Sequence, residues 1–116
     1  MRKKIFYLST CSTCQRIIKE LGLSDEFEYQ DIKTQKITEA QLDEMAKMAG
    51  SYEALFSRVA MKYKALGLKD MDLSEQDYRN YIMEEYTFLK RPVFIIGDQI
   101  FISNSKKNIA VVAEAL

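Results

Sequence analysis

The chain has two cysteines, and they lie three residues apart between a short apolar segment and an amphipathic one. Residues 4–8 are typical of a buried strand, and the apolar spacing of residues 14–22 predicts a helix that ends at Gly22. A CxxC pair, Cys11 and Cys14, between a strand and a helix places two thiols at the positive end of a helix dipole, which lowers the pKa of a thiol. We therefore expect the rest of the chain to hold and to serve this site.

The charge balance and the hydropathy pattern exclude several classes of protein. The 116 residues suffice for one domain with a single core, and Lys plus Arg equals Asp plus Glu, at 17 each. Bulk binding of DNA or RNA needs a basic surplus, so no direct contact with nucleic acid is expected. No apolar run approaches the ~20 residues that cross a bilayer, and the N-terminus lacks a signal-peptide cleavage site. We expect a cytoplasmic protein with no membrane partner, in which a cysteine pair is more often redox-active than a structural disulfide.

The sequence contains no histidine, which removes the commonest general base and the commonest metal ligand. A structural zinc site needs four nitrogen or sulfur ligands, and this chain offers two thiols. No metal site is therefore expected.

The first part of the chain predicts strand, helix and strand, and the middle part predicts helices alone. Residues 27–32 alternate apolar and polar side chains, as in a half-exposed strand, and the short connections imply that this strand runs parallel to the first. Residues 39–49 predict a helix in which Thr38 and Gln41 form a capping box. Residues 58–66 predict a further helix in a segment without strands.

The last part of the chain returns to strands. Two apolar runs, residues 91–96 and 99–102, flank a Gly-Asp pair and predict a hairpin, and Ser105 is expected to cap a closing helix over residues 106–116. Together the elements predict one α/β domain with a mixed four-stranded sheet and an inserted all-helical lobe. Its expected extents are residues 1–116 for the domain, approximately 1–35 and 88–116 for its core, and approximately 36–87 for the helical insertion.

Pro92, the one proline of the chain, opens the hairpin directly after Lys90 and Arg91. A strand start tolerates the missing N–H group, so an ordinary edge position is one interpretation. A cis peptide bond beside a functional site is the other.

These features in combination resemble the arsenate reductase (ArsC) and Spx family. The resemblance rests on the CxxC after the first strand, the helical insertion, the runs over residues 55–68 and 89–95, and the proline that opens the late hairpin. It implies a thioredoxin-like fold of the glutaredoxin type, in which Pro92 is a cis proline that faces the active cysteine. The likeness covers nearly the whole chain.

The chemistry of the pair follows from its spacing. Cys11 precedes the helix and is expected to be the exposed nucleophile, while Cys14, one turn later, is expected to resolve whatever Cys11 forms by closing a disulfide. An oxyanion substrate needs cations around its oxygens. The resemblance implies that Arg91 is the oxyanion ligand, and Arg58 and Arg16 are further candidates.

Two functions remain open within the family. Its arsenate reductases carry a lone active cysteine and a third arginine after the hairpin, whereas this chain has Cys14 and, after the hairpin, Lys106 and Lys107. One hypothesis is a reductase of arsenate or a related oxyanion or disulfide, without a bound cofactor, that takes electrons from glutathione and glutaredoxin or from thioredoxin. The alternative is an Spx-like redox-sensing regulator that binds the C-terminal domain of the RNA polymerase alpha subunit. A general glutaredoxin-type oxidoreductase is a third hypothesis, but it leaves the helical lobe unexplained.

Overall fold

The computed structural model describes residues 2–102 and 104–116. Contacts divide the chain into two compact units. Unit 1 comprises Met1–Lys36 and Arg91–Leu116, and unit 2 comprises Ile37–Lys90. Within the described residues, no helix is long and apolar enough to cross a membrane.

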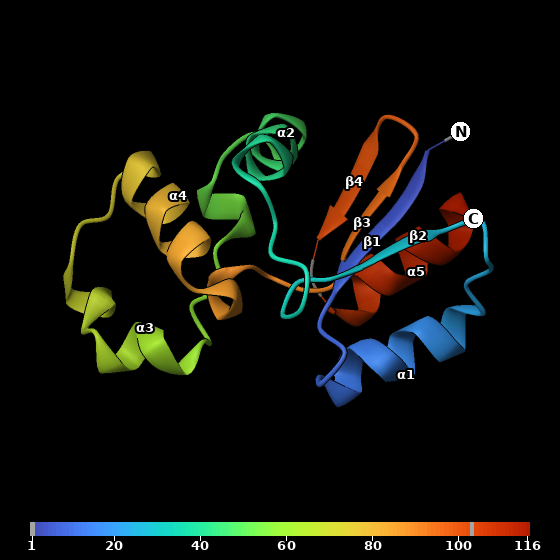
Figure 1. Ribbon diagram of the computed structural model, residues 1–116, viewed down its shortest axis with the longest axis horizontal. Coiled ribbons are helices and arrows are strands. Elements are labelled where there is room, and N and C mark those ends of the chain that lie inside the picture. The colour runs from blue at the N-terminus through green and yellow to red at the C-terminus, as the bar shows by residue number, and fades with distance from the viewer. Residues whose placement is uncertain (1, 103) are drawn as a thin grey trace. The chain divides into compact units, whose positions relative to one another are not determined.

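Unit 1 is built on a four-stranded sheet in the order β2-β1-β3-β4 (Figure 1). β1 pairs in parallel with β2 and antiparallel with β3, and β3 pairs antiparallel with β4. The expected parallel pair and the expected hairpin are therefore both confirmed. The strands are β1 (Lys3–Tyr7), β2 (Glu28–Asp31), β3 (Val93–Ile96) and β4 (Gln99–Ile102).

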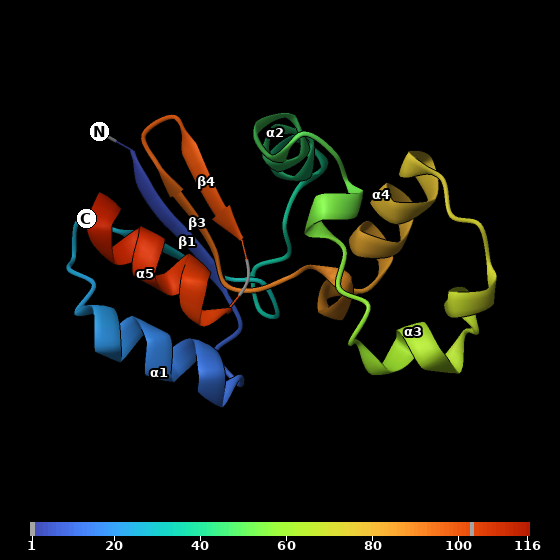
Figure 2. The same cartoon turned by 180° about the vertical axis from the view of Figure 1, so that it is seen from behind.

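Two helices, α1 (Ser12–Leu21) and α5 (Lys106–Ala115), lie on one face of this sheet (Figures 1 and 2). α1 ends as expected, because Gly22 adopts the left-handed conformation at φ 60° that a side chain disfavours. The helices and the sheet bury a common apolar cluster, in which the rings of Phe27 and Phe94 meet edge to face with centroids 6.5 Å apart. The buried members of this cluster are Ile5, Ile17, Phe27, Phe94, Ile96, Phe101 and Val112.

The expected alternation in β2 is wrong in one respect. The apolar Tyr29 is 38% exposed, while the polar Gln30 is 2% exposed. Gln30 is tolerated there because its side-chain amide donates a hydrogen bond of 3.0 Å to the carbonyl of Gln35. The sequence pattern cannot reveal this partner, since it lies in the loop after the strand.

Unit 2 is helical throughout its regular elements. Its α-helices are α2 (Glu39–Ala49), α3 (Met61–Ala65) and α4 (Glu75–Glu84), and three short 3-10 turns cover Glu53–Leu55, Leu68–Asp70 and Tyr86–Phe88. The capping box of Thr38 and Gln41 is confirmed, with both reciprocal hydrogen bonds present.

The helix expected over residues 58–66 is shorter than predicted. α3 begins only at Met61, because Phe56 and Leu89 form an isolated antiparallel bridge and the N–H of Ser57 bonds to the carbonyl of Phe88 at 2.7 Å. This pairing holds the chain extended before the helix starts. Phe56 is also the centre of an aromatic cluster, with ring centroids 4.9 Å from Tyr78 and 5.0 Å from Phe88.

Candidate functional site

Both cysteines lie at the end of the sheet where β1 finishes. Cys11 occupies the N-cap position of α1 with an extended backbone, and its N–H bonds to the carbonyl of Leu8 at 3.0 Å. Cys11 is partly exposed and Cys14, in the first turn of α1, is fully buried. A reactant from solvent therefore reaches the sulfur of Cys11, whereas the sulfur of Cys14 is shielded from solvent.

Several groups favour the thiolate of Cys11. Burial alone raises the pKa of Cys11, but the backbone N–H and thiol of Cys14, the N–H of Thr13 and the charge of Arg91 outweigh burial, so its pKa lies below the usual value. The N–H groups at the start of a helix have no partners within the helix and are free to face an anion. These groups therefore favour the thiolate form of Cys11.

Cys14 has the opposite character. Burial and the neighbouring Cys11 together raise the pKa of Cys14 to about 11, although a backbone hydrogen bond of Leu8 and the charge of Arg91 act in the other direction. Cys14 therefore stays protonated near neutral pH and donates its thiol proton toward the Cys11 sulfur. A pair with one thiolate and one thiol is the arrangement that disulfide exchange requires.

The candidate cations have three different settings. Arg91 lies two residues before β3 and is joined to Pro92 by a cis peptide bond. Its charge lowers the pKa of both cysteines. Arg16 is exposed on α1. Arg58 belongs to unit 2, where its guanidinium bonds to the Glu53 carboxylate at 2.7 Å. The structure thus brings Arg91 to the thiols, and it engages Arg58 with a carboxylate of its own unit.

The carboxylate of Asp31, at the end of β2, holds the turn that precedes Cys11. It accepts hydrogen bonds from the hydroxyl of Ser9 at 2.5 Å, from the N–H of Ser9 at 3.3 Å and from the N–H of Lys33 at 3.2 Å. The side-chain amide of Gln15 donates to the carbonyl of Ser9 from the other side. Sequence reasoning did not identify this clamp, because Ser9 and Asp31 are 22 residues apart and no motif links them.

We expect Asp31→Asn to lower the free energy of unfolding by about 1–2 kcal/mol at neutral pH, because the amide cannot accept all three bonds. Although burial alone raises the pKa of Asp31, the bonds from Ser9 and Lys33 lower it below the usual value. A carboxylate with a lowered native pKa stabilises the fold above its unfolded pKa and loses this effect as pH falls through the native pKa. Urea titrations at pH 7 and pH 3 should therefore show a difference between wild type and variant that shrinks at pH 3. An equal loss at both pH values would contradict the clamp.

We also expect the alkylation of Cys11 by iodoacetamide to rise with pH through a midpoint below the ordinary ~8.5 of a free cysteine. Mass spectrometry should find one alkylated thiol below pH 9, since the pKa of the buried Cys14 is about 11. Arg91→Ala should move the midpoint upward because a cation is lost, and Arg91→Lys should move it less because the charge remains. Arg2→Ala, at the other end of β1, serves as the control. Equal midpoints for Arg91→Ala and wild type would remove Arg91 from the site.

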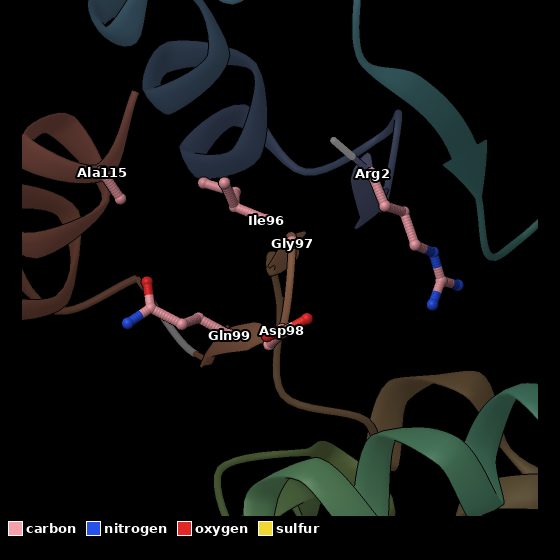
Figure 3. A pocket seen from close by; sticks show the side chains of 6 residues that line it. All are labelled: Arg2, Ile96, Gly97, Asp98, Gln99 and Ala115. Atoms are coloured by element: carbon pink, nitrogen blue, oxygen red, sulfur yellow. The ribbon is translucent and has the colours of Figure 1, made fainter.

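A surface pocket lies at the opposite end of the sheet (Figure 3). It surrounds the hairpin turn at Gly97, whose N–H bonds to the carbonyl of Arg2, the residue before β1. In Figure 3 the polar ends of Arg2 and Gln99 point away from each other, so they do not converge on a ligand. Among residues 2–102 and 104–116, no three histidine, cysteine or carboxylate side chains are grouped to hold a metal. The thiols therefore remain the candidate site.

A mixed four-stranded sheet with a strand-helix start, and a partly exposed cysteine at the N-cap position of the first helix, define an α/β protein with a thioredoxin-like fold. A model of the ArsC family matches residues 6–112, so the chain belongs to the ArsC family. No curated protein matches the sequence.

Solved structures share this fold. An arsenate reductase from Vibrio cholerae superposes with a TM-score of 0.79 at 19% identity, covering 100% of this chain and 98% of the other. An arsenate reductase related protein from Brucella melitensis superposes with a TM-score of 0.69 at 16% identity, covering 96% and 93%. At these identities the likeness shows the fold.

Proposed function

We propose that this chain is a thiol-dependent reductase that acts on arsenate or on a related oxyanion or disulfide through Cys11 and Cys14. The observation that carries the proposal is the opposite character of the two thiols beside one cation: burial and Cys11 raise the pKa of Cys14, while the pKa of Cys11 is lowered. Cys11 attacks the substrate, and Arg91 stabilises the anionic oxygens or the departing thiolate. With arsenate, the Cys11 sulfur displaces one protonated oxygen as water; with a disulfide, it displaces one sulfur as a thiolate. Cys14 then attacks the Cys11 sulfur, the Cys11–Cys14 disulfide forms, and arsenite or the second thiolate leaves with the bonding electron pair. The two thiols thereby supply the two electrons of the reduction.

For turnover, the proposed reductase needs an external reductant that restores both thiols. Glutathione with glutaredoxin, or thioredoxin, is the proposed electron donor, and the cytoplasm is the proposed location. Arg16 and Arg58 remain proposed substrate ligands, but Arg91 is the main one. The guanidinium of Arg58 already pairs with the carboxylate of Glu53.

A coupled assay tests this proposal. NADPH consumption is followed with the purified reduced protein and either the glutathione and glutaredoxin system or the thioredoxin system, with arsenate or hydroxyethyl disulfide as substrate. Activity above that of Cys11→Ser with at least one combination is expected. Rates equal to those of Cys11→Ser in all four combinations would exclude the reductase.

An Spx-like regulator is the second candidate, and the paired thiols together with Lys106 and Lys107 after the hairpin favour it. In this case the Cys11–Cys14 disulfide acts as a switch for binding to the C-terminal domain of the RNA polymerase alpha subunit. A pull-down with that domain, with and without oxidant, distinguishes the two functions. Equal failure to bind in both states would remove the regulator.

A further inference from the structure

Positive charge in unit 1 gathers at the end that carries the thiols. At this end β1 finishes, β2 leads into its following loop, β3 begins, and both helices start (Figures 1 and 2). The pairing of Phe6 with Val93, and of Val93 with Ile102, fixes these strand ends together. We call the six cationic side chains at this end the basic rim: Arg16, Lys33, Lys36, Arg91, Lys106 and Lys107.

The distribution of charge within unit 1 is one-sided. The rim holds six of the ten Lys and Arg residues of this unit but one of its seven Asp and Glu residues. That one carboxylate, Asp31, is occupied by hydrogen bonds from Ser9 and Lys33. Toward the start of β1 the cations are instead compensated, since Lys3 pairs with Glu26 at 2.7 Å and Lys4 with Glu28 at 2.5 Å.

The rim cations face solvent. All except Arg91 are exposed, and within the part of the chain that the structure describes none of these five forms an ion pair. Because the whole chain has no net charge, attraction for an anion depends on a local concentration of cations, and within unit 1 that concentration is the basic rim. The basic rim therefore favours the approach of negatively charged partners to Cys11.

The spread of the rim favours a polypeptide over a small anion. An oxyanion at Cys11 uses Arg91, whose charge already acts on the cysteine. The remaining cations lie on three further segments, α1, the loop after β2 and α5, so they offer separate contacts to a ligand longer than one small anion. An extended peptide advances ~3.3 Å per residue and carries a carboxylate to each of them.

We infer that the reduced protein acts on polypeptide disulfides whose cysteine is flanked by carboxylates, and that the basic rim recognises these carboxylates. This inference rests on the proposed redox function and names its substrate class. Complementary charge of this kind raises the rate of encounter more than it changes the chemistry.

The reaction balances without a further reactant. The Cys11 thiolate attacks one sulfur of the peptide disulfide, which forms a mixed disulfide and releases the other peptide sulfur as a thiolate. Cys14 gives its proton to that thiolate and attacks the Cys11 sulfur. The Cys11–Cys14 disulfide forms, the second peptide sulfur leaves as a thiolate that takes a proton from water, and two electrons have passed from the protein to the peptide.

Two synthetic peptide disulfides of equal length test the inference, one with glutamates and one with lysines around its cysteine. Each is mixed with the pre-reduced full chain in a single turnover, and released thiol is followed. At ~10 mM ionic strength the Debye length is ~30 Å, and the glutamate peptide should react at least about tenfold faster. At 1 M salt, where the Debye length is ~3 Å, the ratio of rates should fall to about one.

Two double variants with the same change in net charge test whether the preference for the glutamate peptide arises at the basic rim. Lys33→Glu with Lys106→Glu should reduce or invert the ratio of glutamate to lysine peptide, while Arg2→Glu with Lys19→Glu, which changes the net charge equally, should leave it largely unchanged. The ratio compares the rates at which one variant reduces the two peptides. A moderate loss of folded protein lowers both rates equally and therefore leaves the ratio unchanged. Circular dichroism checks that both variants fold.

The outcomes distinguish a failure of this inference from a failure of the proposed redox function. If neither peptide is reduced, the proposed redox function fails. If both are reduced at equal rates at low salt, or if both double variants alter the ratio alike, the rim has no selective role and the inference is overturned. A ten-nucleotide single-stranded DNA that competes with the glutamate peptide better than an equal charge of polyglutamate would also overturn it, because the rim would then serve nucleic acid.

Discussion

Cys11→Ser is expected to lower the rate of disulfide reduction at least about a thousandfold, because removing the nucleophile removes the bond on which both steps depend. A serine hydroxyl at this position does not ionise near neutral pH and cannot form a mixed disulfide. The measurement is a single turnover of pre-reduced protein with hydroxyethyl disulfide, followed by the thiol released.

Ser12→Ala is the matched control for this experiment. Ser12 is the exposed first residue of α1, so its replacement disturbs the same turn while both thiols remain. Its rate should stay within about threefold of wild type, as for a surface change of less than ~0.5 kcal/mol. A Cys11→Ser rate above a tenth of wild type would show that Cys14 acts alone and that the assignment of roles is reversed.

The parts of the fold that the sequence predicts best are those decided by neighbours in the chain. Thr38 and Gln41 form their capping box three residues apart, and Gly22 ends α1, because each of these structures depends on one or two turns of backbone. The CxxC is local in the same sense. Its position at a helix start already indicates that Cys11 is the more exposed thiol.

The parts that the sequence misses depend on distant partners. α3 starts later than expected because Phe56 and Leu89 pair across 33 residues of sequence, and β2 buries Gln30 instead of Tyr29 because an amide bond to a loop carbonyl compensates it. Propensity and periodicity contain no information about such contacts. They predict the kind of element and misplace its boundary or its buried face.

The same distinction applies to the candidate site. The sequence predicts the thiols and, through the resemblance, Arg91 as site residues, because these belong to compact motifs. It misses Asp31, whose bonds to Ser9 join the end of β2 to the turn before Cys11. A nucleophile at a helix start needs such support, since a displaced turn would move the sulfur away from the N–H groups that lower its pKa.

Cys14→Ser is expected to separate the two steps of the reaction. Cys11 keeps its position at the helix start, and the serine hydroxyl replaces the thiol of Cys14 as a hydrogen-bond donor, so the first attack should proceed within about tenfold of the wild-type rate. The second step has no sulfur to perform it. The chain has two cysteines, so the variant contains no other thiol that could resolve the adduct.

The stoichiometry of a single turnover measures this separation. Pre-reduced wild type should release two substrate thiols per protein and end with a Cys11–Cys14 disulfide. Cys14→Ser should release one and retain the other half of the substrate as a mixed disulfide, which intact-mass spectrometry detects and dithiothreitol removes. Cys11→Ser should show no adduct. If Cys14→Ser released two thiols and carried no adduct, Cys14 would not be the resolving thiol, and an external thiol would have to take that role.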